Sequence, residues 1–148
     1  MPGIEIREAV DAEVAEVLRV LAESGIDGER SFTVDEAREH IARIRQRATY
    51  RLLVALVDGE ILGTYSLVLV DKLGKRGSPA GVVEDVAVSP SAQRKGVGRA
   101  MMAHAIEECR KAGCYKVALS SNLKRSDAHR FYESLGFERH GYSFAVFL

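Results

Sequence analysis

The sequence predicts a single α/β domain with a mixed central sheet, in which some strand pairs are parallel and others antiparallel. Apolar periodicity over the 148 residues switches between strand and helix patterns, with no internal repeat or linker. An Asp58-Gly59 pair between two apolar runs indicates an antiparallel hairpin. One strand–helix–strand unit follows and indicates a parallel pair. Residues 1–148 are therefore expected to form one domain with helices beside the sheet.

The first half of the chain predicts a strand, two helices and the hairpin. Residues 3–8 alternate between apolar and polar, and the helical spacing that follows ends near Gly25. A capping box from Thr33 to Glu36 starts the second helix, with Phe32 placed to pack on Ala37. The expected buried face of that helix is Ala37, Ile41, Ile44 and Ala48. The hairpin strands are expected at residues 51–57 and 61–70.

The second half predicts a loop, a long helix and four further strands. Residues 71–81 contain three glycines and a proline, which is typical of a loop. A strand at residues 82–88 precedes a helix from about Gly96 to Ala112, with Gly113 as its C-cap. The remaining expected elements are strands at residues 115–121, 137–139 and 142–147, and a short helix capped by Ser126 and stopped by Gly136.

Composition excludes several classes of protein. Lysine plus arginine number 21 and aspartate plus glutamate also number 21, a balance that does not indicate a nucleic-acid partner. The apolar runs are far shorter than the ~20 residues of a membrane span, and residues 1–7 do not resemble a signal peptide. Cys109 and Cys114 make neither a disulfide framework nor a zinc site. We expect a cytoplasmic protein without a membrane partner.

The most informative segment joins the strand at residues 82–88 to the start of the long helix. It ends in Gln93-Arg94-Lys95-Gly96-Val97-Gly98, where glycines let an anion approach the unpaired amides of a helix N-terminus. Arg94, Lys95 and Arg99 add positive charge, so the pattern favours a phosphate-binding site. It is neither a Rossmann fingerprint nor a P-loop. A glycine-loosened helix start with solvated basic residues is the alternative.

Two segments resemble the GNAT acyltransferase superfamily. Residues 82–99 are similar to its acetyl-CoA motif, Gln/Arg-x-x-Gly-x-Gly/Ala, with Gln93, Gly96 and Gly98 at the motif positions. Residues 120–137 resemble the family's strand–helix–Gly-Phe region, which carries an asparagine and a tyrosine. The resemblance covers nearly the whole chain. It implies the GNAT fold, with a splayed parallel strand pair and flanking helices, and acetyl-CoA as co-substrate.

The resemblance also implies which residues contact acetyl-CoA. The backbone of Val86, Ala87 and Val88 would run beside the pantetheine arm, and an amide there would stabilise the oxyanion of the reaction. Asn122 would contact the same arm. The residues implied at the pyrophosphate are Gln93, Arg94, Lys95, Gly96, Val97, Gly98 and Arg99.

Two residues are candidates for proton transfer. Tyr132 matches the family's general acid, which protonates the leaving CoA thiolate, whereas its helical spacing alone would make it a core aromatic. Glu84 is the candidate base, directly or through a water, because an acceptor amine with a pKa of about 10.4 arrives protonated. A salt-bridged rim carboxylate is the alternative for Glu84. Asp85 is expected on the opposite face of the strand, unless a β-bulge re-aims it.

Acceptor selectivity in this family comes mostly from the loop between the first two helices and from the C-terminal end. Both charge signs are present there, so the sequence does not select one acceptor. The residues concerned are Asp27, Glu29, Arg30, Phe32, Arg139, His140 and Tyr142. The four histidines, His40, His104, His129 and His140, are not spaced as metal ligands, so no metal is expected. His40 and His104 are expected on exposed helix sides.

The sequence as a whole predicts an N-acetyltransferase that moves the acetyl group of acetyl-CoA to a primary amine of a small molecule. The amine would attack directly in a ternary complex. Two alternatives remain: acetylation of a protein N-terminus or lysine, and a non-catalytic module that binds acyl-CoA. A homodimer is also expected, with the C-terminal strand as the candidate contact.

Overall fold

The structure is a computed structural model that describes residues 3–26, 31–47, 49–92 and 94–148. The chain divides into two compact units, Met1–Ala118 and Leu119–Leu148. None of the helices within the described ranges is long and apolar enough to cross a membrane.

The first unit contains a five-stranded sheet in the order β1-β2-β3-β4-β5. Its strands are β1 (Ile4–Glu8), β2 (Tyr50–Val57), β3 (Glu60–Val70), β4 (Ala80–Val88) and β5 (Lys116–Ala118). Neighbouring strands from β1 to β4 are antiparallel, whereas β4 and β5 are parallel. The predicted mixed sheet is confirmed. The parallel pairing stops at Val82 and Ala118, so β4 continues beyond the point where β5 ends.

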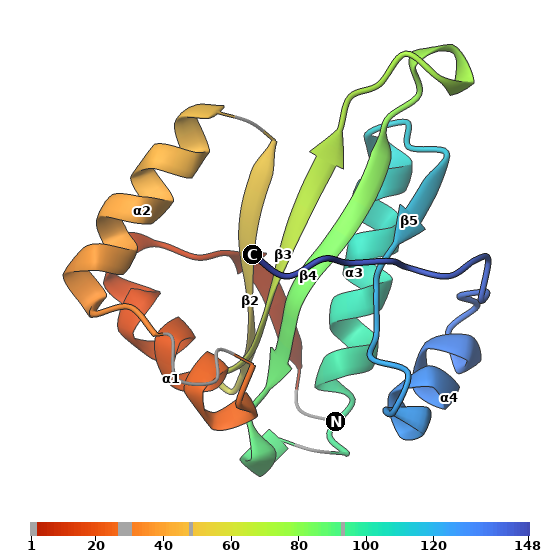
Figure 1. Ribbon diagram of the computed structural model, residues 1–148. Helices are drawn as coiled ribbons and strands as arrows, with labels where there is room; N and C mark the ends of the chain where they lie inside the picture. Colours follow the sequence, from red (N-terminus) through yellow and green to blue (C-terminus); the bar gives the residue numbers. More distant parts are fainter. Residues whose placement is uncertain (1–2, 27–30, 48, 93) are drawn as a thin grey trace. The chain divides into compact units, whose positions relative to one another are not determined.

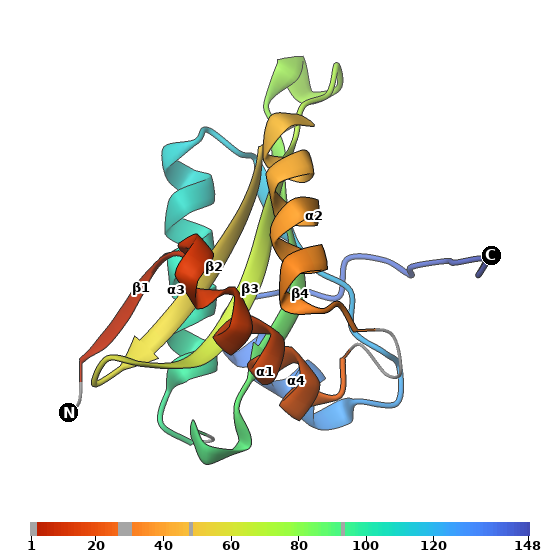
Figure 2. The same ribbon diagram turned by 90° about the vertical axis from the view of Figure 1, so that its left-hand side faces the viewer.

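Helices cover both faces of this sheet. Figures 1 and 2 show α1 (Val14–Ser24) and α2 (Val34–Arg47) on one face, and α3 (Val97–Lys111) on the other. Apolar residues of α1, of the sheet and of the segment after β1 form a buried cluster on the α1 side, and its members are Ala9, Val17, Val20, Leu52, Val54, Leu56, Ile61 and Ala87. Burial of these side chains holds α1 against the strands.

Several short-range signals in the sequence form as predicted. Thr33 N donates to Glu36 Oε1 at 3.0 Å and Glu36 N donates to Thr33 Oγ1 at 3.2 Å, which is the predicted capping box. Gly25 ends α1 in the left-handed conformation, with φ 74°. Asp58 and Gly59 both have positive φ, 51° and 81°, as a two-residue hairpin turn requires.

Other boundaries differ from the prediction. β4 begins at Ala80, inside the predicted loop, and β5 has only three residues instead of seven. In the second unit, α4 (Ser126–Ser134) has Arg125 as its N-cap and no side-chain capping bond, so the predicted Ser126 cap is wrong. Ala48, predicted on the buried face of α2, lies outside the described residues.

The two predicted C-terminal strands are wrong. No strand is assigned over residues 137–148, and Tyr142, Phe144 and Phe147 are 84, 91 and 94% exposed. Alternating apolar residues show that a segment can form a strand. The strand itself also needs a neighbour to accept and donate its backbone hydrogen bonds, which the pattern does not supply.

Candidate active site

The junction between β4 and α3 has the geometry of an anion site. A 3-10 turn, Pro90–Ala92, follows β4, and Lys95 N donates to Ala92 O at 3.1 Å. Gly96 then adopts φ 81° as the N-cap, and α3 begins at Val97. The first N–H groups of a helix have no intrahelical acceptor and lie at the positive end of its dipole. Gln93, predicted at this site, lies outside the described residues.

Space and charge at this junction both suit a phosphate group. A Cβ placed on Gly96 would have no atom within 4 Å, so the backbone is open to a ligand. Arg94 and Lys95 are exposed beside it, and Arg94 adopts the left-handed backbone with φ 68°. An amide-lined helix start with two adjacent cations is well matched to an anion such as a pyrophosphate. We call Arg94–Gly98 the phosphate cradle.

The end of β4 offers unused backbone for an extended ligand. On one side Ala87 pairs with Thr64 and Val88 with Gly63 of β3. On the other side, where β5 pairs with β4 only as far as Val82, no strand pairs with these residues in the described ranges. The backbone there can accept and donate hydrogen bonds, as the family resemblance requires of Val86, Ala87 and Val88.

A β-bulge in β4 separates the two acidic neighbours. Ser66 pairs with Glu84 but Thr64 pairs with Ala87, so Asp85 and Val86 together oppose Tyr65. Asp85 has φ 52°, in the left-handed region. Both carboxylates are exposed, but the bulge brings Asp85 to the lining of a cavity, whereas Glu84 is not among the lining residues. Strict alternation along the strand therefore does not describe this segment.

That cavity lies between α1, α2 and the sheet and has a volume of about 330 Å³. Its described lining is mostly aliphatic and aromatic: Val14, Val17, Leu18, Leu21, Phe32, Ala37, His40, Ile41, Ile44, Tyr50, Leu52, Thr64, Ser66 and Asp85. Tyr50 Oη and Ser66 Oγ lie 2.6 Å apart. Burial raises the pKa of Tyr50, and the negative charge of Asp85 raises it further.

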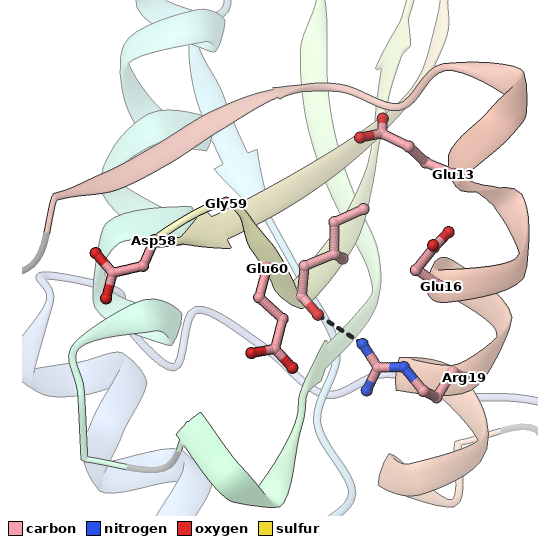
Figure 3. Close-up of a pocket in the computed structure, with 7 residues that line it drawn as sticks. Glu13, Glu16, Arg19, Asp58, Gly59 and Glu60 are labelled. Atoms are coloured by element: carbon pink, nitrogen blue, oxygen red, sulfur yellow. Dashed lines mark hydrogen bonds between the residues drawn. The ribbon is translucent and has the colours of Figure 1, made fainter.

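A second hollow, of about 370 Å³, lies between α1 and the β2–β3 turn (Figure 3). It is acidic, with Glu13, Glu16, Asp58 and Glu60 in its lining. Arg19 Nη2 donates to Ile61 O at 2.8 Å across one side (Figure 3). No group of acidic, histidine or cysteine side chains in the described residues could hold a metal ion.

The other predicted site residues belong to the second unit. The Tyr132 ring packs edge-on against Phe131 and Phe137, with centroids 5.3 and 5.8 Å away. Burial raises the pKa of Tyr132, so its phenol stays protonated at neutral pH. Asn122 Oδ1 accepts from Lys124 N at 2.9 Å, and His129 Nε2 lies 2.8 Å from Asn122 O. Asn122 therefore organises the loop before α4.

The structure corrects two histidines, and part of the acceptor loop lies outside the described residues. His40, expected on an exposed helix side, is half-buried and lines the cavity between α1, α2 and the sheet. His104 is half-buried, and Tyr65 Oη lies 2.7 Å from its Nδ1, so the expected exposed position is wrong. Its partner is on β3, 39 residues earlier, and no local pattern in the sequence indicates the contact. The predicted acceptor residues Asp27, Glu29 and Arg30 lie outside the described residues.

Comparison with known proteins agrees with this geometry. Residues 17–137 match the model of the Acetyltransferase (GNAT) family. A glucosamine 6-phosphate N-acetyltransferase from Trypanosoma brucei brucei is 38% identical over 103 residues, 68% of each chain. An aminoalkylphosphonate N-acetyltransferase from Salmonella typhimurium is 30% identical over 144 residues, 97% of this chain and 91% of the relative. A solved structure described as a putative acetyltransferase from Agrobacterium tumefaciens superposes with a TM-score of 0.90 at 26% identity, covering 97% of this chain and 99% of the other.

Proposed function

This chain belongs to the GNAT acetyltransferase family, and from that premise we propose that it transfers the acetyl group of acetyl-CoA to a primary amine of a small molecule. The amine would attack the thioester directly in a ternary complex. The observation that carries the proposal is the phosphate cradle, where an open helix start with Gly96 at φ 81° lies directly after β4. Acetyl-CoA carries a pyrophosphate that such a site can bind.

The residues of this chain supply binding and proton transfer. Amides of the phosphate cradle and of Arg99 would hold the pyrophosphate, with Gln93 beside them. The backbone of Val86, Ala87 and Val88 would hydrogen-bond the pantetheine arm, and Asn122 would contact it. These backbone positions are supported by the free side of β4 beyond Val82.

Tyr132 would act as the general acid and Glu84 as the base. The raised pKa of Tyr132 keeps a proton on its hydroxyl at neutral pH, which the leaving thiolate can take. Glu84, exposed on β4 one residue before the bulge, would take the ammonium proton directly or through a water. Cys109 is buried and its pKa is raised to about 12, which makes it a poor nucleophile and favours direct transfer.

A small-molecule acceptor is favoured over a protein acceptor. Two relatives that align with two thirds or more of the chain are named for glucosamine 6-phosphate and for aminoalkylphosphonate, both small amines. We also propose a cytoplasmic homodimer. Exposed apolar side chains at Tyr142, Phe144 and Phe147 support a contact between copies, and free thiols at Cys109 and Cys114 support a reducing compartment.

Thermal unfolding with and without acetyl-CoA, followed by an assay for free CoA thiol over a panel of amines, tests the proposal. Acetyl-CoA at 100 times its Kd should stabilise the fold by about 2.7 kcal/mol, a rise of several degrees in Tm. Release of CoA thiol with any one amine would identify the acceptor class. No stabilisation at millimolar acetyl-CoA would refute the proposed function.

A further inference from the structure

We propose that the acceptor is a primary amine carried on an apolar body, bound in the cavity between α1, α2 and the sheet, with Asp85 as the partner of its ammonium group. The inference deepens the proposed function and rests on it, since it identifies this cavity as the place of the acetyl acceptor. Three observations carry it: the apolar walls, the position of one carboxylate, and the absence of lysine and arginine from the described lining.

The walls of the cavity suit an apolar body. Aliphatic side chains from both helices and from β2 line it, among them Leu18, Leu21, Ile41 and Leu52. Its volume of about 330 Å³ is near the lower end of the roughly 300–1,000 Å³ typical of small-ligand sites. Phe32 lines the same cavity, and the centroid of its ring lies 5.1 Å from that of the His40 ring. Because Phe32 is 46% exposed, the end of the cavity at Phe32 is open to solvent.

The polar groups of the cavity suit a cation. The bulge in β4 turns Asp85 into the lining, near the hydroxyl pair of Tyr50 and Ser66, which lie 2.6 Å apart. An alkylammonium with a pKa of about 10.4 is charged at neutral pH and needs an anionic partner when it leaves water. Asp85 is the one carboxylate in the described lining, and the two hydroxyls can accept further hydrogen bonds from the ammonium.

The same lining argues against a phosphorylated or sugar-like acceptor. Neither lysine nor arginine is among the described lining residues, and Arg45, whose charge acts on Tyr50, lies outside that lining, so a phosphate group in the cavity would lie beside Asp85 without a lysine or arginine of the described lining in contact with it. Sugar hydroxyls facing Leu21, Ile41 and Ile44 would lose hydrogen bonds to water without replacement. The chain thus differs in its expected acceptor from the relatives named for glucosamine 6-phosphate and aminoalkylphosphonate.

A single tryptophan can report binding in this cavity. The natural sequence has none, so Phe32→Trp places one fluorophore at the cavity entrance of the full chain. Its fluorescence is titrated at pH 7 with 2-phenylethylamine, with the neutral 2-phenylethanol and with glucosamine 6-phosphate. We expect 2-phenylethylamine to bind at least tenfold more tightly than either of the others. Equal or tighter binding of glucosamine 6-phosphate would overturn the proposal.

Two further variants separate charge from shape. In the Phe32→Trp background, Asp85→Asn should remove the preference for the amine over the alcohol, while Asp71→Asn, an exposed aspartate outside the cavity, should keep it. Leu21→Phe should weaken amine binding at least tenfold by narrowing the cavity, which provides a test if Asp85→Asn does not fold. An unchanged preference in a folded Asp85→Asn protein, or unchanged binding in Leu21→Phe, would refute the assignment.

Thermal stabilisation by acetyl-CoA, measured on the same proteins, distinguishes failure of the acceptor assignment from failure of the proposed acetyltransferase function. Stabilisation by acetyl-CoA without amine binding would refute this inference alone. Amine binding without stabilisation by acetyl-CoA would refute the proposed function and leave the cavity as an amine site without an acetyl donor.

Discussion

Gly63 on β3 lies directly against Val97, the first residue of α3. A Cβ on Gly63 would lie 2.7 Å from Val97 Cγ1 and 3.1 Å from Met101 Sδ, closer than packed side chains allow. The missing side chain therefore lets the start of α3 approach the sheet. Because the phosphate cradle is this same helix start, Gly63 sets the distance between the proposed anion site and the strands.

Gly63→Ala should therefore weaken both the fold and the binding of acetyl-CoA. Overpacking of a well-packed core costs typically about 1–3 kcal/mol, and the β-branched Val97 side chain is restricted to few χ1 rotamers in a helix. We expect the free energy of unfolding, measured in urea, to fall by that amount. Calorimetry should show several-fold weaker binding of acetyl-CoA. Adding Val97→Ala should recover part of both. A double variant no better than Gly63→Ala alone would show that the contact does not set the helix position.

The cations of the phosphate cradle should matter for acetyl-CoA and not for folding. Lys95→Gln should weaken acetyl-CoA binding several-fold at low salt and reduce its salt dependence, since Lys95 is exposed beside the helix start. Lys111→Gln is the matched control, because Lys111 is the last residue of α3, at the opposite end of the helix. Equal losses in the two variants would mean that binding senses net charge and not the cradle.

The parts of the fold that could be predicted from sequence are those decided within a few residues. The capping box of Thr33 and Glu36 and the turn at Asp58-Gly59 involve residues that are close in the chain, so their chemistry is readable locally. The length of β5 and the absence of a strand at residues 137–148 depend on which neighbours pair with them. Residue patterns alone do not contain that information.

The candidate site follows the same division. The helix start at Gly96 and Val97 was predictable because a helix N-terminus, its glycines and its cations are consecutive in the sequence. The cavity at Asp85 was not, since the bulge lies in the register between β3 and β4, and the walls come from α1, α2 and β2. The Tyr65–His104 contact joins residues that are 39 positions apart, so it likewise could not be predicted from the sequence.

Tyr132→Phe should lower kcat at least tenfold with little change in acetyl-CoA binding. Phenylalanine keeps the ring between Phe131 and Phe137 and removes only the hydroxyl that would protonate the thiolate. Steady-state kinetics together with thermal stabilisation by acetyl-CoA check both parts. Tyr115→Phe, which removes the hydroxyl from an exposed tyrosine outside the proposed site, serves as the control. An unchanged kcat would remove Tyr132 from the acid role.

Glu84→Gln should reduce the rate mainly at lower pH. Below the amine's own pKa of about 10.4 most of the acceptor is protonated and needs a base, whereas near pH 10 much of it is already neutral. The ratio of wild-type to variant kcat/KM, measured from pH 6.5 to 9.5, should therefore fall as pH rises. A ratio that is constant across this range would assign the proton to another base or to bulk water.

His104 should make the stability of the protein depend on pH. Burial lowers the pKa of His104, the nearby negative charge of Glu108 raises it, and the positive charge of Arg51 lowers it further. The folded state therefore favours the neutral imidazole, which can accept a hydrogen bond from Tyr65. The unfolded chain, with a pKa of about 6.5, therefore binds the proton more readily. Stability from the neutral imidazole is complete above pH 6.5 and is lost as pH falls from there toward the folded-state pKa.

Thermal unfolding of the wild type and of His104→Asn between pH 5 and 8 measures this contribution. Asparagine can still accept from the Tyr65 hydroxyl but does not titrate, so its Tm should fall less than that of the wild type by a few degrees between pH 7 and 5. Tyr65→Phe removes the hydroxyl and keeps the titrating imidazole, so it should retain the steeper acid loss. If His104→Asn and the wild type lose Tm in parallel, the acid sensitivity arises elsewhere in the fold.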